Sequence, residues 1–281
     1  MRLKNTNKIV VFAITVIALF TTANAAEETK KKTEPVDAQT AAVSAFLDKL
    51  PPQLLQSLSN SLAEYKAAPE IKKEPVPERM AFGQKESPVH IVKWLDILCP
   101  HCKHMDETLH AILQDTPDNS WSLEIRNYPL DKECNSNVNF SAEDGVRCLA
   151  AKVMICQTDP AELERIRFEL FQQQKFLTTE RIWLSAASDE AKKKKLETCV
   201  KSAETEATLK EDIDFAKQHG ITGTPLLAFN NKKIENFPPL VYALILAQGD
   251  VNNTAFLALP PASPKNPDDH VSHGHDHKHD H

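Results

Sequence analysis

Apolar residues recur at helical spacing in the first part of the chain, between residues 36 and 68. These positions lie three or four residues apart: Val43, Phe46, Leu47, Leu50, Leu54, Leu58, Leu62 and Tyr65. Such spacing places the side chains on one face of a helix, and Pro51 and Pro52 must interrupt it because proline fits only a first turn. We predict two helices whose apolar face packs on a second copy of the chain, as a homodimer or larger oligomer; the alternative is packing on the same chain.

A second apolar pattern begins at residue 89. It follows residues 69–87, which have prolines among charges and are predicted to be a linker or an edge strand. Residues 89–98 are rich in β-branched and bulky apolar side chains, which is typical of a central strand covered on both faces. Residues 102–113 then return to helical spacing, and residues 121–128 alternate as in a strand with one buried face.

Helical patterns dominate the next part of the chain, about residues 140–218. Asp159, Pro160 and Glu162 form a capping signature before an apolar repeat, and further helical stretches cover residues 179–187, 189–202 and 206–218. Residues 226–234 predict a β-hairpin, which a helix over 239–247 follows, and residues 249–281 form a C-terminal extension. The predicted fold is α/β, with an inserted helical subdomain and a preceding N-terminal helical segment.

Composition and the N-terminal segment indicate the class of protein and the cellular compartment in which it acts. The 281 residues are 41% hydrophobic and include six glycines, enough for one elaborated helix-rich domain or two small ones. Residues 1–25 combine cations, an apolar run and an Ala23-Asn24-Ala25 cleavage site, which predict a signal peptide rather than an uncleaved anchor, and residues 26–35 a disordered leader. We therefore expect a periplasmic or otherwise exported protein. The formal net charge of -6 is mixed along the chain and gives no reason to expect nucleic acid.

The candidate chemistry lies where the central strand ends, at Cys99, Pro100, His101 and Cys102. Cys99 is expected at the start of the following helix, where unpaired N–H groups and the helix dipole stabilise the thiolate that attacks. Pro100 fixes φ in the turn, and His101 adds a hydrogen bond or a positive charge. The pattern favours a redox pair that passes its disulfide to other proteins. The alternatives are a structural disulfide or a zinc half-site, but the body of the chain lacks the second ligand pair that such a zinc site needs.

Residues 88–248 resemble the thioredoxin fold of the DsbA-like thiol oxidoreductases. The resemblance depends on the segment from Trp94 to Cys102 and on Gly220-Ile221-Thr222-Gly223-Thr224-Pro225. It implies that Pro225 follows a cis peptide bond and lies against the Cys99 sulfur, and that the backbone at Thr224 pairs with an extended substrate segment.

The other cysteines lie outside this motif. The segments around Cys134 and Cys148 also resemble the thioredoxin-like domains associated with vitamin K epoxide reductase homologues. That resemblance implies a disulfide between these two, which we expect to be structural, with an electron relay as the alternative. Cys156 and Cys199 lie on helical patterns and form either a second bridge or two buried thiols.

Lys93 is a departure from the pattern of the family. Many thioredoxin-like proteins have a buried acid six positions before the first cysteine, where this chain has Lys93. A lysine there must be neutral, paired or directed towards solvent. Asp96 is present as in nearer relatives, but by strand parity it points to the opposite face from Lys93.

The end of the chain alternates histidine with Asp, Gly and Lys. Weak metal binding by this tail is a possibility that composition alone raises. The residues concerned are His273, His275, His277, His279 and His281.

Together these features predict an exported thiol-disulfide oxidoreductase that acts on substrate proteins with thiols or disulfides. Cys99 forms the mixed disulfide and Cys102 resolves it. We expect no bound cofactor, and a membrane redox partner that resets the pair. The alternatives are a dimeric disulfide isomerase or reductase, and a metal-binding or chaperone-like module.

Overall fold

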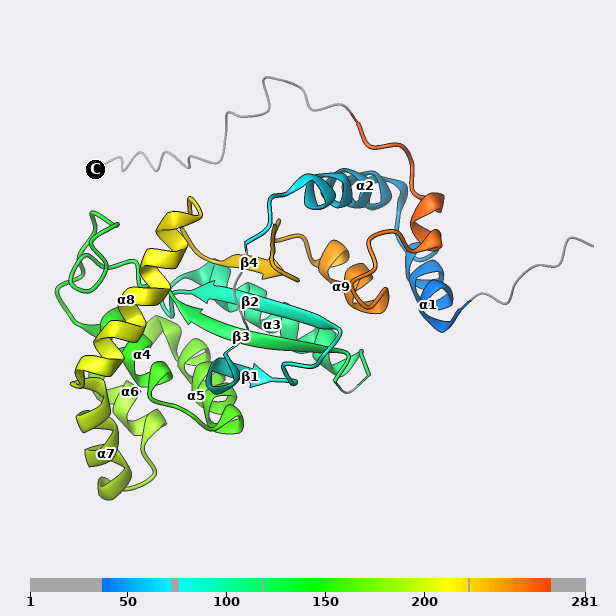
Figure 1. Ribbon diagram of the computed structural model, residues 1–281. Coiled ribbons are helices and arrows are strands. Elements are labelled where there is room, and N and C mark those ends of the chain that lie inside the picture. The colour runs from blue at the N-terminus through cyan, green and yellow to red at the C-terminus, as the bar shows by residue number, and fades with distance from the viewer. Residues whose placement is uncertain (1–36, 72–75, 118, 222, 264–281) are drawn as a thin grey trace, which may run out of the picture. The chain divides into compact units, whose positions relative to one another are not determined.

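One five-stranded sheet organises the part of the chain that the structure describes. The computed structural model describes residues 37–71, 76–117, 119–221 and 223–263. The predicted signal peptide, the leader and the histidine-rich tail lie outside these residues. The strand order is β1-β3-β2-β4-β5 (Figure 1). Among the described helices, none has both the length and the apolar character that a membrane span requires.

The strand before the cysteines, β2 (Val89–Leu95), lies in the middle of the sheet. It runs parallel to β3 (Trp121–Asn127) and antiparallel to β4 (Leu226–Phe229). The short strands β1 (Met80–Phe82) and β5 (Lys232–Ile234) form the two edges, each antiparallel to its neighbour. The segment over residues 69–87 therefore supplies an edge strand.

Helices surround the sheet and follow the predicted segments. Four helices of the insertion begin with a side-chain cap, in which Asp159, Thr178, Asp189 or Ser202 accepts a hydrogen bond from an N–H three residues on. The helices α4 to α8 come between β3 and β4 and form the predicted subdomain (Figure 1). The described α-helices are α1 (Ala38–Leu47), α2 (Pro52–Ala67), α3 (Pro100–Gln114), α4 (Val146–Ile155), α5 (Pro160–Gln172), α6 (Thr179–Ala186), α7 (Glu190–Val200), α8 (Ala203–Gln218) and α9 (Pro238–Leu246).

The two faces of the sheet bury different apolar clusters. Ile91 and Leu95 of β2 belong to a cluster that includes buried residues of α1, α2, α3, α5 and α9. Val92 and Trp94 belong to a second cluster, with buried residues of α8. Because alternate side chains of a strand point to opposite faces, β2 is covered on both sides, as its apolar run predicts.

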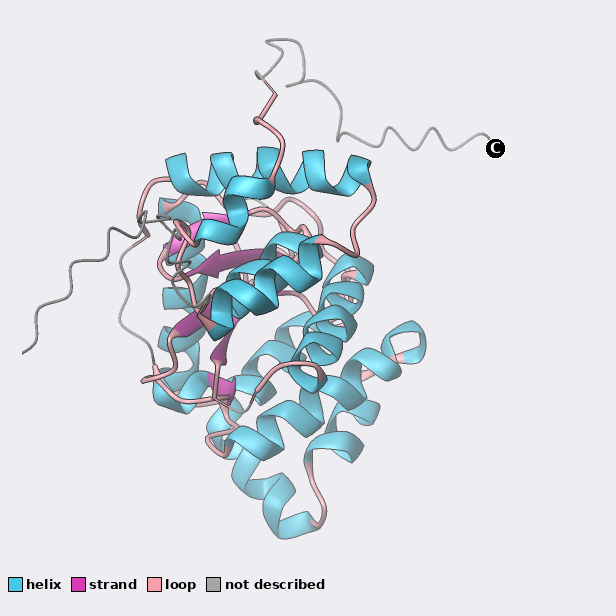
Figure 2. Ribbon diagram, turned by 90° about the vertical axis from the view of Figure 1, so that its right-hand side faces the viewer, coloured by secondary structure: helices cyan, strands magenta, loops and turns pink. Residues whose placement is uncertain are grey.

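Most of the apolar face of α1 and α2 packs on the same chain, which is the alternative that the sequence left open, and a homodimer through these helices stays a prediction. Val43 and Leu58 are fully buried, and the Tyr65 hydroxyl donates a hydrogen bond to the Phe229 carbonyl of β4 at 2.8 Å. Figure 2 is viewed from the side on which α1 lies and shows these helices against the rest of the fold. The apolar side chains that suggested a homodimer through residues 36–68 are therefore largely covered within the chain itself.

The C-terminal extension supplies part of this cover. A 3₁₀ helix, η3 (Thr254–Ala258), contacts α1. Ser59 of α2 donates a hydrogen bond to the Pro260 carbonyl at 2.5 Å. Residues on both sides of the predicted 88–248 domain thus belong to one folded unit with it, and part of the cover of the N-terminal helices comes from the far end of the sequence.

Candidate active site

The two cysteines of the motif lie at the start of α3, just beyond the end of β2. Cys99 is the N-cap residue and Pro100 the first helical residue, a position that suits proline because its missing N–H has no helical partner there. Cys102 lies in the first turn, and its N–H donates to the Cys99 carbonyl at 3.1 Å. Both cysteines are free thiols in this structure. His101 between them is exposed.

The segment before β4 reaches the same point. The peptide bond between Thr224 and Pro225 is cis, and the Cys99 thiol donates to the Thr224 carbonyl oxygen at 3.3 Å. Residues 125 positions apart thus meet at the sulfur. The structure therefore brings together the residues that the sequence places at the site: Cys99, Pro100, His101, Cys102, Thr224 and Pro225.

The two thiols differ in acidity. A hydrogen bond from the Cys102 thiol, together with contacts to Thr224, outweighs burial and lowers the pKa of Cys99 from 9.0 to about 5. Burial raises the pKa of Cys102 well above its usual range. The Cys99 residue is 6% exposed and Cys102 is 0% exposed. Because the thiolate is the reactive species, the arrangement favours Cys99 as the attacking sulfur and keeps Cys102 protonated.

Gln174, which the sequence did not single out, fixes the loop before the helix. It follows α5 in the inserted subdomain, and its side-chain N–H₂ donates to the Ile97 carbonyl at 2.7 Å and to the Cys99 carbonyl at 3.0 Å. A single glutamine in a helical stretch carries no pattern that marks such a role. Its position links the insertion to the cysteine motif.

Asp96 also holds this loop in place. Its carboxylate accepts hydrogen bonds from the N–H groups of Leu98 and Leu130, each at 2.8 Å, and contacts the Arg147 guanidinium of α4. The Asp96 carboxylate thus binds both backbone N–H groups and an arginine of the inserted subdomain. It positions the segment between β2 and Cys99.

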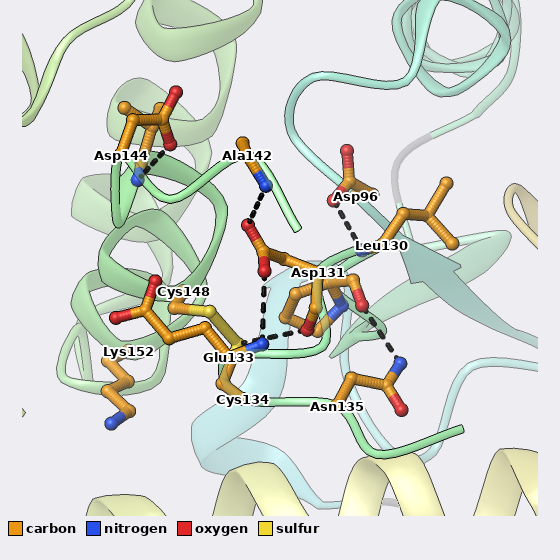
Figure 3. Close-up of a disulfide and its surroundings, with 12 residues drawn as sticks. Asp96, Leu130, Asp131, Glu133, Cys134, Asn135, Ala142, Asp144, Cys148 and Lys152 are labelled. Carbon is orange, nitrogen blue, oxygen red and sulfur yellow. Dashed lines mark hydrogen bonds between the residues drawn. A yellow bond between two sulfur atoms is a disulfide. The ribbon is translucent and has the colours of Figure 1, made fainter. Parts of the chain in front are cut away.

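The remaining cysteines form two disulfides. Cys134 is joined to Cys148, next to the Asp131 carboxylate, which accepts from the N–H groups of Glu133 and Ala142 (Figure 3). Asp131, Glu133 and Cys148 place ligand-type atoms within 4.8 Å of one another, but the Cys148 sulfur is already in the disulfide.

The second disulfide joins Cys156, the C-cap residue of α4, to Cys199 in α7. Of the two alternatives for this pair, the structure has the bridge, which fastens two helices of the insertion to each other. The tail histidines proposed as weak metal ligands lie outside the described residues.

Lys93 adopts the paired state among those that the sequence allows. The residue is 0% exposed, and its ammonium lies 2.7 Å from the Asp106 carboxylate of α3. Burial lowers the pKa of Lys93 well below its usual range. The Lys93 side chain therefore lies inside the fold, against the cysteine-bearing helix α3.

The chain is similar to a protein-family model, to a curated protein and to solved structures. Residues 76–240 match a family model described as thioredoxin. Disulfide bond formation protein D of Bacillus subtilis (strain 168) is 26% identical over 181 residues, which cover 60% of this chain and 73% of that protein.

Among solved structures, oxidised BdbD from Bacillus subtilis is 18% identical, with a TM-score of 0.44, over 67% of this chain and 96% of that one. The alpha-DsbA1 of Wolbachia pipientis is 15% identical, with a TM-score of 0.49, over 66% of this chain and 96% of that one. The family match includes both cysteines of the motif and the segment with Thr224 and Pro225.

Proposed function

This chain belongs to the thioredoxin family and is a thiol-disulfide oxidoreductase of the DsbA-like kind, and on that premise we propose that it gives its disulfide to exported proteins through Cys99 and Cys102. The observation that carries the proposal is the environment of Cys99. Its sulfur lies at a helix start, and the hydrogen bond from the Cys102 thiol lowers its pKa to about 5. A thiolate so stabilised favours the reduced pair, and so makes the disulfide a strong electron acceptor.

The reaction proceeds by two thiol-disulfide exchanges. A substrate thiolate attacks the Cys99 sulfur of the oxidised pair, a bond forms between the two sulfurs, and the electron pair of the broken bond leaves on Cys102. A second substrate thiolate then attacks the substrate sulfur of this mixed disulfide, and the electron pair leaves on Cys99. The substrate is oxidised, the pair is reduced, and the protons of the substrate thiols go to Cys102 and to solvent.

The compartment is inferred from the signal-peptide pattern, and the partners are inferred from the thiol chemistry. Residues 1–25 have the pattern of a signal peptide, and disulfides persist in the oxidising compartments to which such signals lead. The substrates are proteins with pairs of thiols, and a membrane redox partner must oxidise Cys99 and Cys102 again after each turnover. Thr224 offers backbone groups beside the sulfur where an extended substrate segment can pair.

Donation is the better-supported direction. A dimeric isomerase would need a second copy of the chain, and the α1 and α2 face that suggested one is mostly covered by the chain itself.

Oxidation of a synthetic peptide with two thiols by the mature, oxidised protein tests the proposal. Wild type should form the peptide disulfide, and Cys99→Ser should form none. Cys102→Ser, treated with oxidised glutathione, should accumulate a mixed disulfide between glutathione and Cys99, because no Cys102 thiol remains to displace the glutathione. Circular dichroism of each variant controls for folding. A wild-type protein that leaves the peptide reduced, or a mixed disulfide at Cys102 in Cys99→Ser, would contradict the assigned roles.

A further inference from the structure

The position of Lys93 in the sheet is unusual for a cation. Along β2 it lies between Ile91 and Leu95, and across the sheet it is opposite Ile125 of β3 and Leu227 of β4. All four neighbours are buried and apolar. Burying an ammonium among such groups is costly unless it is paired. Packing alone therefore does not explain why a lysine occupies this position.

The contacts of Lys93 connect it to the second cysteine. Its Nζ donates to the Asp106 carboxylate at 2.7 Å and to the backbone carbonyl of Cys102 at 3.3 Å, and lies 5.4 Å from the centre of the Phe171 ring. Cys102 and Asp106 are one helical turn apart on α3, so both contacts face the strand from the same side of the helix. The ammonium thus lies directly beneath the turn that carries Cys102.

A second basic side chain shares Asp106 with Lys93. The Arg167 guanidinium of α5, also buried, contacts the same carboxylate, and its other end contacts Glu164. We call these four residues, Lys93, Asp106, Arg167 and Glu164, the thiol-side cluster. Its one inner acid serves two cations, so positive charge is in excess at the end nearest the cysteines.

The outer acid only partly offsets this excess. The Glu164 side chain is 24% exposed and 3.8 Å from His110. Burial raises the pKa of Glu164 to about 7, so a large fraction is neutral at neutral pH. Glu164 therefore adds little negative charge to the two basic side chains that share Asp106.

We propose that Lys93 is a positioning residue of the redox pair, whose ammonium stabilises the thiolate that leaves on Cys102 when a substrate thiolate attacks Cys99. The inference rests on the proposed function. In that step the bond between the two cysteine sulfurs breaks and the electron pair stays on the Cys102 sulfur, which is 0% exposed to water. A buried anion of this kind needs a counter-charge inside the protein, and a better-stabilised leaving thiolate leaves faster. The influence is mutual, since the thiolates of Cys102 and Cys99 raise the pKa of Lys93 against the effect of burial.

The rate at which reduced glutathione opens the oxidised pair, measured by quenching and alkylation of the freed thiols, tests this inference. Lys93→Met should slow this step about tenfold, because the leaving sulfur loses its counter-charge. The variant should fold, because Asp106 keeps Arg167 as a partner. Lys93→Gln keeps a donor for the Cys102 carbonyl but not the charge, and should be as slow as Lys93→Met.

The control is Arg79→Met, which removes another buried cation, paired with Asp212 of α8. It should react at the wild-type rate. A wild-type rate in Lys93→Met, or a rate restored by glutamine alone, would overturn the role given to the charge. A wild-type protein that fails to oxidise the dithiol peptide would instead overturn the proposed function, whatever the Lys93 variants do.

Discussion

Two groups of buried charges lie against the same sheet and have different consequences. On one side is the thiol-side cluster around Lys93. The other group, which we call the helix-side cluster, consists of Arg79, Arg126, Asp212 and Glu124. In it Asp212 of α8 contacts both arginines and accepts the Asn127 N–H of β3 at 2.9 Å.

The difference lies in how each group is compensated and what it contacts. Each group has two acids and two cations, and one acid of each contacts both cations. In the helix-side cluster the second acid, Glu124, has a pKa that His90 and Arg126 lower against the effect of burial, and the contacts join α8 to β3 and to the segment before β1. In the thiol-side cluster burial raises the pKa of the second acid, Glu164, to about 7, and a cation contacts the turn that carries Cys102. Similar ion pairs therefore fasten a helix on one face of the sheet and support thiol chemistry on the other.

The largest expected effect comes from breaking the helix-side cluster. Asp212→Asn leaves two buried guanidiniums without their shared acid and should lower the free energy of unfolding by about 3–5 kcal/mol, measured by urea denaturation. The rate at which reduced glutathione opens the disulfide should stay at the wild-type value in the folded protein. The matched control is Asp214→Asn on the same helix, whose exposed pair with Lys210 should contribute little. A change in thiol rate with unchanged stability would remove the distinction between the clusters.

A pH series sharpens the comparison on the thiol side. The pKa of Cys99 is about 5 in the folded reduced protein and 9.0 ordinarily. Because folding lowers this pKa, the thiolate contributes stability that is fully present above about pH 9 and is lost as the pH falls through 5. As the pH falls from 9 to below 5, the free energy of unfolding of reduced wild type should therefore decrease relative to that of reduced Cys99→Ser. The difference between oxidised wild type and reduced Cys99→Ser should not change in this way, because the oxidised pair has no thiolate. If the free energies of unfolding of the two reduced proteins change with pH in the same way, Cys99 is not a stabilised thiolate.

A smaller effect is expected at Gln174, which also lies on the thiol side. Gln174→Ala removes two hydrogen bonds to carbonyl groups of the cysteine loop and should cost about 1–2 kcal/mol of stability. Since one of those carbonyls belongs to Cys99, peptide oxidation should slow as well. Gln172→Ala, at an exposed position of α5, is the control and should change neither quantity. Slower oxidation in both variants would show that the glutamine contacts are not specific.

The sequence predicted the elements and the cysteine motif well because both depend on local patterns. The apolar run of β2, the caps of the inserted helices and the spacing of Cys99 and Cys102 are all readable within a short window. The family resemblance added the cis peptide bond before Pro225, the approach of that segment to Cys99 and the pairing of Cys134 with Cys148, which no local pattern contains.

What the sequence could not provide depends on contacts between distant segments. The face of α1 and α2 seemed to need a second copy, because its cover comes partly from η3 and residue 260 near the other end of the chain. Lys93 was visible as a departure, but Arg167, which shares its partner Asp106, lies on α5, and no spacing rule connects the two. Gln174 likewise acts only because the insertion folds back onto the cysteine loop.

The pH dependence of alkylation tests the central claim most directly, namely that Cys99 is the stabilised, reactive thiolate of the reduced pair. The fully reduced protein is treated with iodoacetamide at a series of pH values, and the labelled cysteine is identified by peptide mapping. The account predicts labelling at Cys99 with a midpoint near pH 5, and Cys102 unmodified in the folded protein. A midpoint near pH 9, or labelling that falls first on Cys102, would contradict it.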